Sequence, residues 1–286
     1  MITQINDNLS TIIQDVVKQY PEILSHLSEK SILAMKKKRR ISNPLADREK
    51  LEKRLTKILG KQFDREGKQF LSLLGNPPDI GNVPNSFWAK ENVLMANAIL
   101  PELLGISRQQ AQGLADQMSI GVDWGMVNER AVRAARLQTD TLIQQFMDTS
   151  REGTKKTWET FFQEGQSVGM TVAEYFEQNN ITMGDLEAFF QPYFGLDRAR
   201  MIAVTETTRA ASLGELALVD EISAQNPDII FTPIWQTDND DIVCEICEPR
   251  NGTASGGDEW DIETDGPPPA HVNCRCWLSH DIGVRE

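Results

Sequence analysis

The position of the cysteines constrains this chain more than any other feature, because all four lie between residues 244 and 276 of a 286-residue sequence. Cys244-x2-Cys247 is followed, after 23 residues, by His271-x2-Cys274-x-Cys276. A Cys-x2-Cys pair on a tight turn presents two thiolates to one ion, and a second pair from another loop completes a tetrahedron. The spacing therefore predicts a local metal site near the C-terminus, rather than a disulfide framework distributed over the fold.

Five residues compete for the four positions around such an ion. We favour the four cysteines, because Cys274 and Cys276 are two residues apart and face the same way on a strand. His271 is then either the alternate fourth ligand or a residue that donates a hydrogen bond to one of the ligands. Neither set leaves an open position for a substrate water, so we expect one structural zinc ion per chain.

The loop over residues 251–269 gives a physical reason for a metal here. It is rich in Gly, Asp and Pro, and it holds too little apolar surface to order itself. A metal cross-link supplies the order that the missing core does not. Two disulfides, a redox-active Cys-x-x-Cys pair and inert thiols are the open alternatives, and no βαβ pattern surrounds the cysteines to support the redox reading.

Most of the remaining chain has apolar residues at helical spacing. Proline and glycine clusters mark the breaks, including a linker over residues 75–85. We expect helices over residues 12–20, 47–74, 87–118 (one or two helices, the second beginning at Pro101), 127–162 and 198–225.

The pattern changes after residue 226. Residues 228–237 are β-branched and aromatic and predict a strand, in which Pro233 indicates an edge position or a bulge. A turn at 238–241 and a short closing strand at 274–279 complete the region. The expected fold is mainly α with a small C-terminal α+β cap stapled by zinc. We divide it into an N-terminal helical, partly basic region (1–80), a helical body (81–195) and a C-terminal domain that holds the Cys/His cluster (196–286).

Charge is distributed unevenly along the chain, whose net charge is −13. Residues 200–286 hold 17 acidic and five basic residues, whereas residues 30–70 hold 14 basic and five acidic ones. A basic run could contact DNA phosphates without sequence preference, although such runs are more often solvated faces. The run consists of Lys36, Lys37, Lys38, Arg39 and Arg40. The sequence shows neither a signal-peptide pattern nor a long apolar run, so we expect no secretion and no membrane partner.

Two groups of residues carry a resemblance to a known family. The first follows the order Arg198-Ala199, Ile202-Ala203-Val204-Thr205-Glu206, Arg209-Ala210 and Gly214. The second is Trp235-Gln-Thr237, Asp238, Asp241, Val243-Cys244-x2-Cys247, Gly252, Pro268-Pro269, His271 and Cys274-Arg275-Cys276. Together they resemble the phage head morphogenesis family, which is typified by the phage Mu minor head protein F.

That resemblance implies a minor head protein without catalytic activity. Its partners would be the portal protein and the scaffold or major capsid protein, and it would accompany DNA packaging or delivery. It would act in the bacterial cytoplasm during assembly and then lie in the head interior or at the portal vertex. The resemblance also implies structural roles for Glu206, Arg209, Trp235 and Asp238, with Glu206 and Arg209 on one helix face.

Two other classes of function fit the sequence less well than a head-assembly protein. A zinc-dependent nuclease or hydrolase of the HNH type is the enzymatic alternative, but Asn273 follows His271 too closely for that metal finger. A zinc hydrolase is also disfavoured by the lack of a His-Glu-x-x-His motif. A toxin-delivery module is the third alternative, but only ten residues follow Cys276. We therefore expect a protein of head assembly and not an enzyme.

Overall fold

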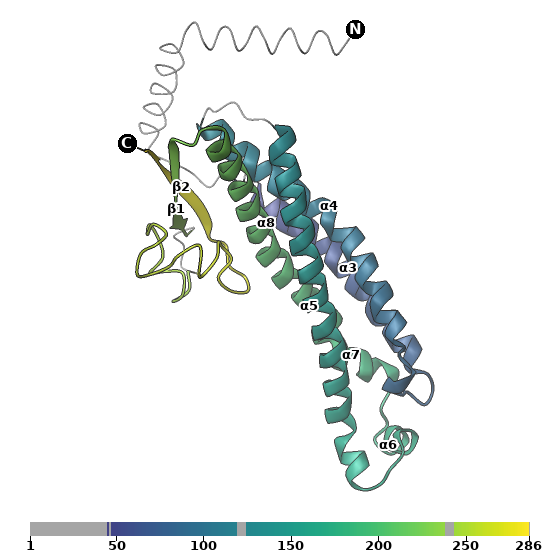
Figure 1. Ribbon diagram of the computed structural model, residues 1–286. Helices are drawn as coiled ribbons and strands as arrows, with labels where there is room; N and C mark the ends of the chain where they lie inside the picture. The colour runs from purple at the N-terminus through teal and green to yellow at the C-terminus, as the bar shows by residue number, and fades with distance from the viewer. Residues whose placement is uncertain (1–44, 46, 119–123, 238–242, 286) are drawn as a thin grey trace, which may run out of the picture.

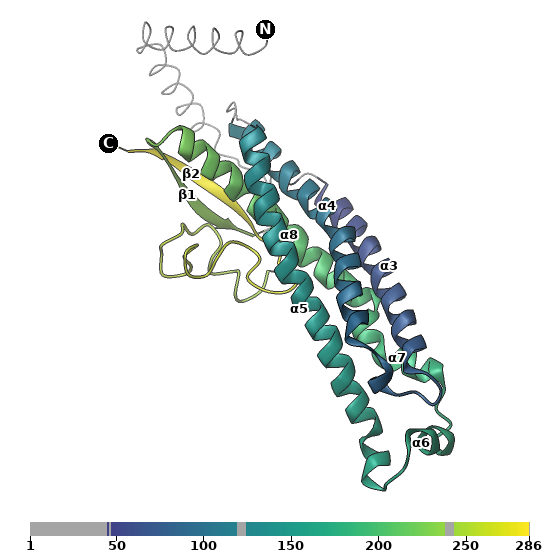
Figure 2. The ribbon, with the colours of Figure 1, turned by 45° about the vertical axis from the view of Figure 1, so that its right-hand side comes forward.

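The computed structural model describes residues 45, 47–118, 124–237 and 243–285 as an elongated helical bundle with a small β-containing cap (Figure 1). The long helices run side by side, and the cap lies against α8 (Figure 2). The elements are α3 (Arg48–Leu74), the 3-10 turn η1 (Ile80–Asn82), α4 (Asn85–Met118), α5 (Trp124–Ser167), α6 (Val172–Gln178), α7 (Met183–Phe194), α8 (Leu196–Gln225), β1 (Ile229–Gln236) and β2 (Trp277–Val284). The expected mainly helical fold with a C-terminal α+β part is therefore confirmed.

Helix α8 is the central element of the molecule, because it contacts α3, α4, α5, α7 and both strands. Its length follows the expected range 198–225 closely. Arg198 near its first turn joins it to two other helices. The guanidinium donates to Ser150 Oγ at 2.7 Å and to Phe146 O at 3.0 Å on α5, and to Tyr193 O at 2.5 Å on α7.

The main core lies between the long helices of the bundle. Its largest fully buried side chains include Phe63 and Phe70 of α3, Ile99 of α4 and Phe190 of α7. The rings of Phe70 and Phe190 meet edge to face with their centroids 5.0 Å apart. The apolar stripe predicted over residues 47–74 is therefore the face that α3 presents to the bundle.

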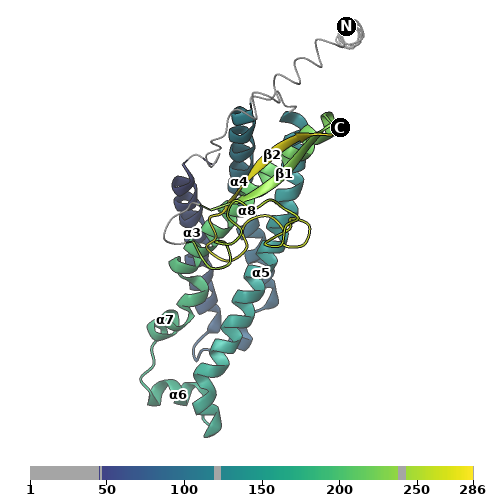
Figure 3. The same ribbon diagram turned by 90° about the vertical axis from the view of Figure 1, so that its left-hand side faces the viewer.

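Helices α6 and α7 lie toward the end of the bundle that is distant from the cap (Figure 3). Each begins with a capping box, in which a threonine side chain accepts from a backbone N–H and an acidic side chain three residues on accepts in return. The pairs are Thr171 with Glu174 and Thr182 with Asp185. These local signals set the starts of two short helices, which lie between the helices expected at 127–162 and 198–225 and were not predicted.

Pro101 does not begin a second helix but lies inside α4, where it is exposed while the neighbouring Ile99 and Leu103 are buried. Packing on that buried side holds the helix together across the missing N–H donor. The helix expected at 12–20 lies outside the described residues. The closing strand begins at Trp277 rather than Cys274.

The late start of β2 has a physical cause. The carbonyl groups of Cys274 and Arg275 accept hydrogen bonds from side chains of α8 and α3, so they are not available for a strand ladder. From Trp277 to Val284 the strand pairs antiparallel with β1, and Pro233 is opposite His280. Each strand of this two-stranded sheet has an edge, which is compatible with a proline in β1.

The bundle also contains a carboxylate that its sequence pattern did not mark as buried. Glu66 of α3 is fully buried, and neither of its carboxylate oxygens has a hydrogen-bond partner among the described residues. Nearby, Arg65 pairs with Glu91 of α4 and donates to its two carboxylate oxygens from Nη1 and Nη2. Burial, together with the charge of Glu91, raises the pKa of Glu66 to about 8, against the opposing charges of Arg198 and Arg65.

This carboxylate makes stability depend on pH. Because the folded-state pKa of Glu66 lies above its ordinary value of 4.5, the folded state binds more protons, and its stability falls as pH rises from about 5 to 8. Glu66→Gln removes this dependence. The free energy of unfolding of Glu66→Gln, relative to that of the wild-type chain, should therefore increase with pH, by at most about 1.4 kcal/mol per pH unit.

Urea unfolding at pH 5, 6.5 and 8 measures this difference directly. Burial also raises the pKa of Glu215 to about 8, but that group titrates alike in both proteins and cancels in the comparison. A pH-independent difference between the two proteins would show that Glu66 is already ionised in the fold.

None of the helices in the described part of the chain is long and apolar enough to span a membrane.

Candidate metal centre

The first arm of the candidate site is the turn that contains Cys244 and Cys247. The amides of Cys247 and Glu248 both donate to Cys244 O, at 3.0 and 2.9 Å. This turn brings the two thiols to the same side of the backbone, as the Cys-x2-Cys spacing predicts. Cys247 is buried, whereas Cys244 is partly accessible.

The second arm is the segment from His271 to Cys276. The amide of Cys274 donates to His271 O at 3.2 Å, and Asn273 between them has a positive φ of 65°. Asparagine tolerates this left-handed conformation better than most residues. Helix α8 fixes this turn, because Thr205 Oγ1 accepts a hydrogen bond from the Asn273 amide at 2.9 Å.

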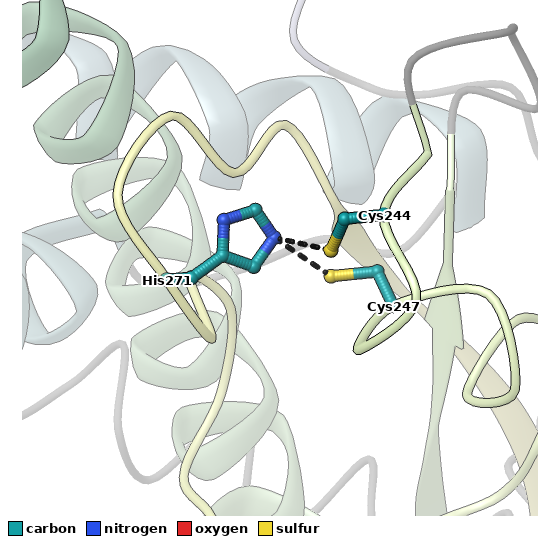
Figure 4. A group of neighbouring side chains, drawn as sticks. All are labelled: Cys244, Cys247 and His271. Atoms are coloured by element: carbon teal, nitrogen blue, oxygen red, sulfur yellow. Dashed lines mark hydrogen bonds between the residues drawn. The ribbon is translucent and has the colours of Figure 1, made fainter.

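The two arms meet around Cys247 (Figure 4). His271 Nε2 lies 2.9 Å from Cys244 Sγ and 3.2 Å from Cys247 Sγ. Cys247 Sγ lies 3.8 Å from Cys274 Sγ. Two groups of candidate ligands result, one of Cys244, Cys247 and His271 and the other of Cys247, Cys274 and Cys276, with ligand atoms within 4.8 Å of one another in each. Cys247 is common to both groups.

These residues fit a tetrahedral zinc ion. Zinc–sulfur bonds of about 2.3 Å place tetrahedral thiolates about 3.8 Å apart, which is the separation of Cys247 Sγ and Cys274 Sγ. The Nδ1 atom of His271 lies 2.8 Å from Val272 O. A proton on Nδ1 would bond that carbonyl and leave the Nε2 lone pair for the metal, as in many ligating histidines.

The interactions among the neighbouring thiols also favour a bound cation. All four cysteines are free thiols in this structure, so neither of the two disulfides is present. Hydrogen bonds from the thiols of Cys247 and Cys276 lower the pKa of Cys274 to about 2, and the bond to Cys274 raises the pKa of Cys247 above its ordinary value. Thiolates this close together repel one another, so several of them can be ionised together only with a positive ion among them.

The residues that hold the candidate ligands match a known protein family. Residues 177–279, about a third of the chain, match the family described as Phage Mu protein F like protein. We name residues 177–279 the Phage Mu F-like domain after the family that they match. The match begins at the end of α6, and it includes α7, α8, β1 and every candidate ligand. Searches among curated proteins and among solved structures found no match.

Tryptophans form the small core of the Phage Mu F-like domain beside the cysteines. Trp235 and Trp260 are both almost fully buried, with their rings edge to face and 5.1 Å apart. Trp260 Nε1 donates to Thr253 O at 3.1 Å, which ties the Gly-rich loop to this core. Arg250 covers the other ring, with its guanidinium carbon 5.1 Å from the centroid of Trp235. Trp277 begins β2 and is also buried.

The other sequence-predicted site residues lie in different places. Arg209 Nε donates to both carboxylate oxygens of Glu206, at 3.2 and 3.3 Å, on the face of α8 that both residues share. Glu206 is buried, and burial raises its pKa despite this partner. Asp238 and the basic run over residues 36–40 lie outside the described residues.

The sequence reasoning missed the residues that hold the second arm. Thr208 Oγ1 donates to Cys274 O at 2.5 Å, and Arg48 donates to Arg275 O at 2.6 Å. Glu52 of α3 binds the Arg275 side chain. Thr208 lies beside the family motif on α8, so its position was a usable signal. Glu52 lies 223 residues from its partner, and no local pattern indicates that pair.

A hollow of about 460 Å³ opens beside the centre, between α8 and the two arms. Cys244 and His271 line it from the cap, and Met201 and Arg200 line it from α8. The accessible side of the candidate ligands therefore faces a recess rather than open solvent. Such a recess provides a route by which an ion reaches the thiols.

Proposed function

We propose that this protein is a minor head protein of a phage or prophage that acts in capsid assembly. The observation that supports this most strongly is the Phage Mu F-like match over residues 177–279, a range that includes α8 and all the candidate ligands. The protein would act in the bacterial cytoplasm during assembly and would then lie in the head interior or at the portal vertex.

We propose further that the metal is one zinc ion with a structural role and that the protein is not an enzyme. The two groups that share Cys247 together hold five candidate ligand atoms, one more than a tetrahedral site needs. The four positions can therefore be filled by protein atoms, which is the arrangement of structural zinc sites. The ion would connect the turn after β1 to the segment before β2, and so hold the cap against α8.

The portal protein is the partner that we propose, together with scaffold or major capsid protein and DNA. The uneven charge of the chain supports these partners, because residues 30–70 are net basic and residues 200–286 are net acidic. A basic segment is suited to phosphates or to an acidic protein surface. We assign portal binding to the N-terminal part of the chain.

A truncation tests this assignment without damaging the bundle. Helix α3 contributes Phe63 and Phe70 to the core, so the deletion should stop at residue 44. The full chain co-expressed with its cognate portal protein should co-purify with it, and the deleted chain should lose at least about tenfold in affinity, equivalent to about 1.4 kcal/mol.

The same two proteins report on DNA. The full chain should retard a random-sequence duplex at 50 mM salt and release it at higher salt, while the deleted chain should not bind. Unchanged circular dichroism and melting temperature would be the control for folding. Equal portal binding by both chains would move the interface into residues 45–286, and no binding by the full chain would contradict the proposed partner.

A further inference from the structure

The Cys274-Arg275-Cys276 segment is bound by a helix that lies outside the Phage Mu F-like domain. Glu52 of α3 accepts from Arg275 Nε at 3.2 Å on one oxygen and from Arg275 Nη2 at 3.0 Å on the other. This is a two-pronged guanidinium–carboxylate pair, which fixes direction as well as distance. Arg275 is the residue between two candidate ligands, so its position determines where both thiols lie.

The backbone of the same segment is held as firmly as its side chain. Arg48, one turn before Glu52 on α3, donates to Arg275 O at 2.6 Å and also to Glu52 Oε1 at 3.0 Å. Arg48 donates to Thr208 Oγ1 as well, and the Thr208 hydroxyl donates onward to Cys274 O at 2.5 Å. The network thus runs from α3 through α8 to a ligand residue.

Burial separates this network from ordinary surface ion pairs. The side chains of Arg48 and Glu52 are 11% and 9% exposed, and that of Arg275, at the end of the network, is 39% exposed. Exposed pairs on the same helix, such as Lys53 with Glu49 at 80% and 85% exposure, are screened by water and contribute little. A buried pair with both partners satisfied fixes geometry more strongly, because leaving either partner alone is costly.

We propose that α3 is part of the metal centre, in that Arg48 and Glu52 are positioning residues that hold Cys274 and Cys276 ready for the ion. This inference rests on the proposed structural metal site and extends it to residues 130 or so positions before the family match begins. Docking of α3 and metal binding then stabilise each other. The metal affinity of the Phage Mu F-like domain therefore depends on α3, and loss of the ion weakens the docking of α3.

The test compares zinc affinity in full-length variants by competition with a chromophoric chelator. Glu52→Gln removes the charge that holds Arg275 and should weaken zinc binding by about 10- to 100-fold, the usual cost of changing a residue that orients ligands. Arg275→Lys keeps the charge but loses the two-pronged geometry, and it should act in the same direction. Glu49→Gln, on the exposed side of α3, is the matched control and should leave the affinity unchanged.

A second readout separates positioning from a general loss of stability. The melting temperature of each protein is measured with zinc and with excess chelator. A merely structural role lowers both values equally, whereas positioning shrinks the increment that zinc adds. The spectrum of the cobalt-substituted protein should keep its thiolate bands in all variants, because the ligands themselves are unchanged.

The outcomes are distinguishable. Wild-type zinc affinity and a full zinc-dependent stabilisation in both Glu52→Gln and Arg275→Lys would overturn the role of α3 and leave the metal site intact. A failure of the wild-type chain to bind zinc would remove the proposed metal site and this inference with it. If Glu52→Gln does not fold, the Arg275→Lys protein decides between the two results.

Discussion

Replacing Cys247 by serine is expected to abolish metal binding and to unfold the cap while the helical bundle persists. Cys247 is the one residue shared by both groups of candidate ligands, so its loss removes the atom that links the two groups. Loss of a structural metal is among the few single changes that cost more than about 4 kcal/mol. Thermal unfolding followed by tryptophan fluorescence reports on it, because Trp235 and Trp260 lie in the cap core.

Two comparisons make this expectation specific. Wild-type protein stripped with a chelator should melt at the same temperature as Cys247→Ser, because both lack the same cross-link. Cys244→Ser should be milder, since Cys244 belongs to one group only and His271 remains beside Cys247. A Cys247→Ser protein that melts like the metal-loaded wild type would contradict a structural metal.

Substituting Gly214 by alanine is expected to have the second largest effect. At this position α8 approaches α4 so closely that an added methyl carbon would lie 2.1 Å from Ser107 O, a backbone atom that cannot move away alone. The close approach also allows Ser107 Oγ to donate to Ala210 O across the helices at 2.7 Å. We expect about 3 kcal/mol of destabilisation or more, at the upper end for overpacked cores.

A glycine on the facing helix provides the control. An added methyl at Gly105 of α4 meets only the end of the Arg54 side chain, at 4.0 Å. Gly105→Ala should therefore stabilise the protein by up to about 1 kcal/mol, because alanine is the better helix former. Urea unfolding measures both variants. Equal, small effects at Gly214 and Gly105 would show that the two helices are less tightly packed than the structure has them.

The helices were predictable where periodicity and sequence breaks agree. The apolar stripe of α3 and the uninterrupted helical composition of α8 gave their ranges to within about two residues. Pro101 misled the prediction, because an exposed proline is tolerated within a helix that packs on its opposite side. That outcome depends on tertiary packing, which local sequence does not contain.

The candidate ligands were predictable because metal chemistry demands particular residue types at short spacing. Cys244, Cys247, Cys274 and Cys276 could be selected on that ground alone. The grouping around Cys247 could not, because it depends on how the two arms fold against α8. Which four ligands an ion takes is also undetermined by spacing, and His271 is as close to the thiols as they are to one another.

Interactions between distant parts of the chain were the least predictable. Glu66 and Glu52 read as members of a charged helix face, yet both are buried. Glu66 lies in the bundle core, and Glu52 holds the arginine between two candidate ligands. Charged residues are almost never buried without a partner, so the sequence favours an exposed position for both. The fold pairs Glu52 with Arg275, whereas Glu66 has no hydrogen-bond partner among the described residues, and a single sequence shows neither arrangement. The same limit hid Arg198 as the link between α8, α5 and α7.

The metal content of the full-length protein, purified under reducing conditions, tests the central claim most directly. Elemental analysis should find one zinc per chain in the wild type and none in Cys247→Ser, and the cobalt-substituted wild type should show the absorption bands of a tetrahedral thiolate site. Four titratable thiols in a folded wild-type protein, with no bound metal and no uptake of added zinc, would contradict the structural zinc and leave the order of the cap to its tryptophan core alone.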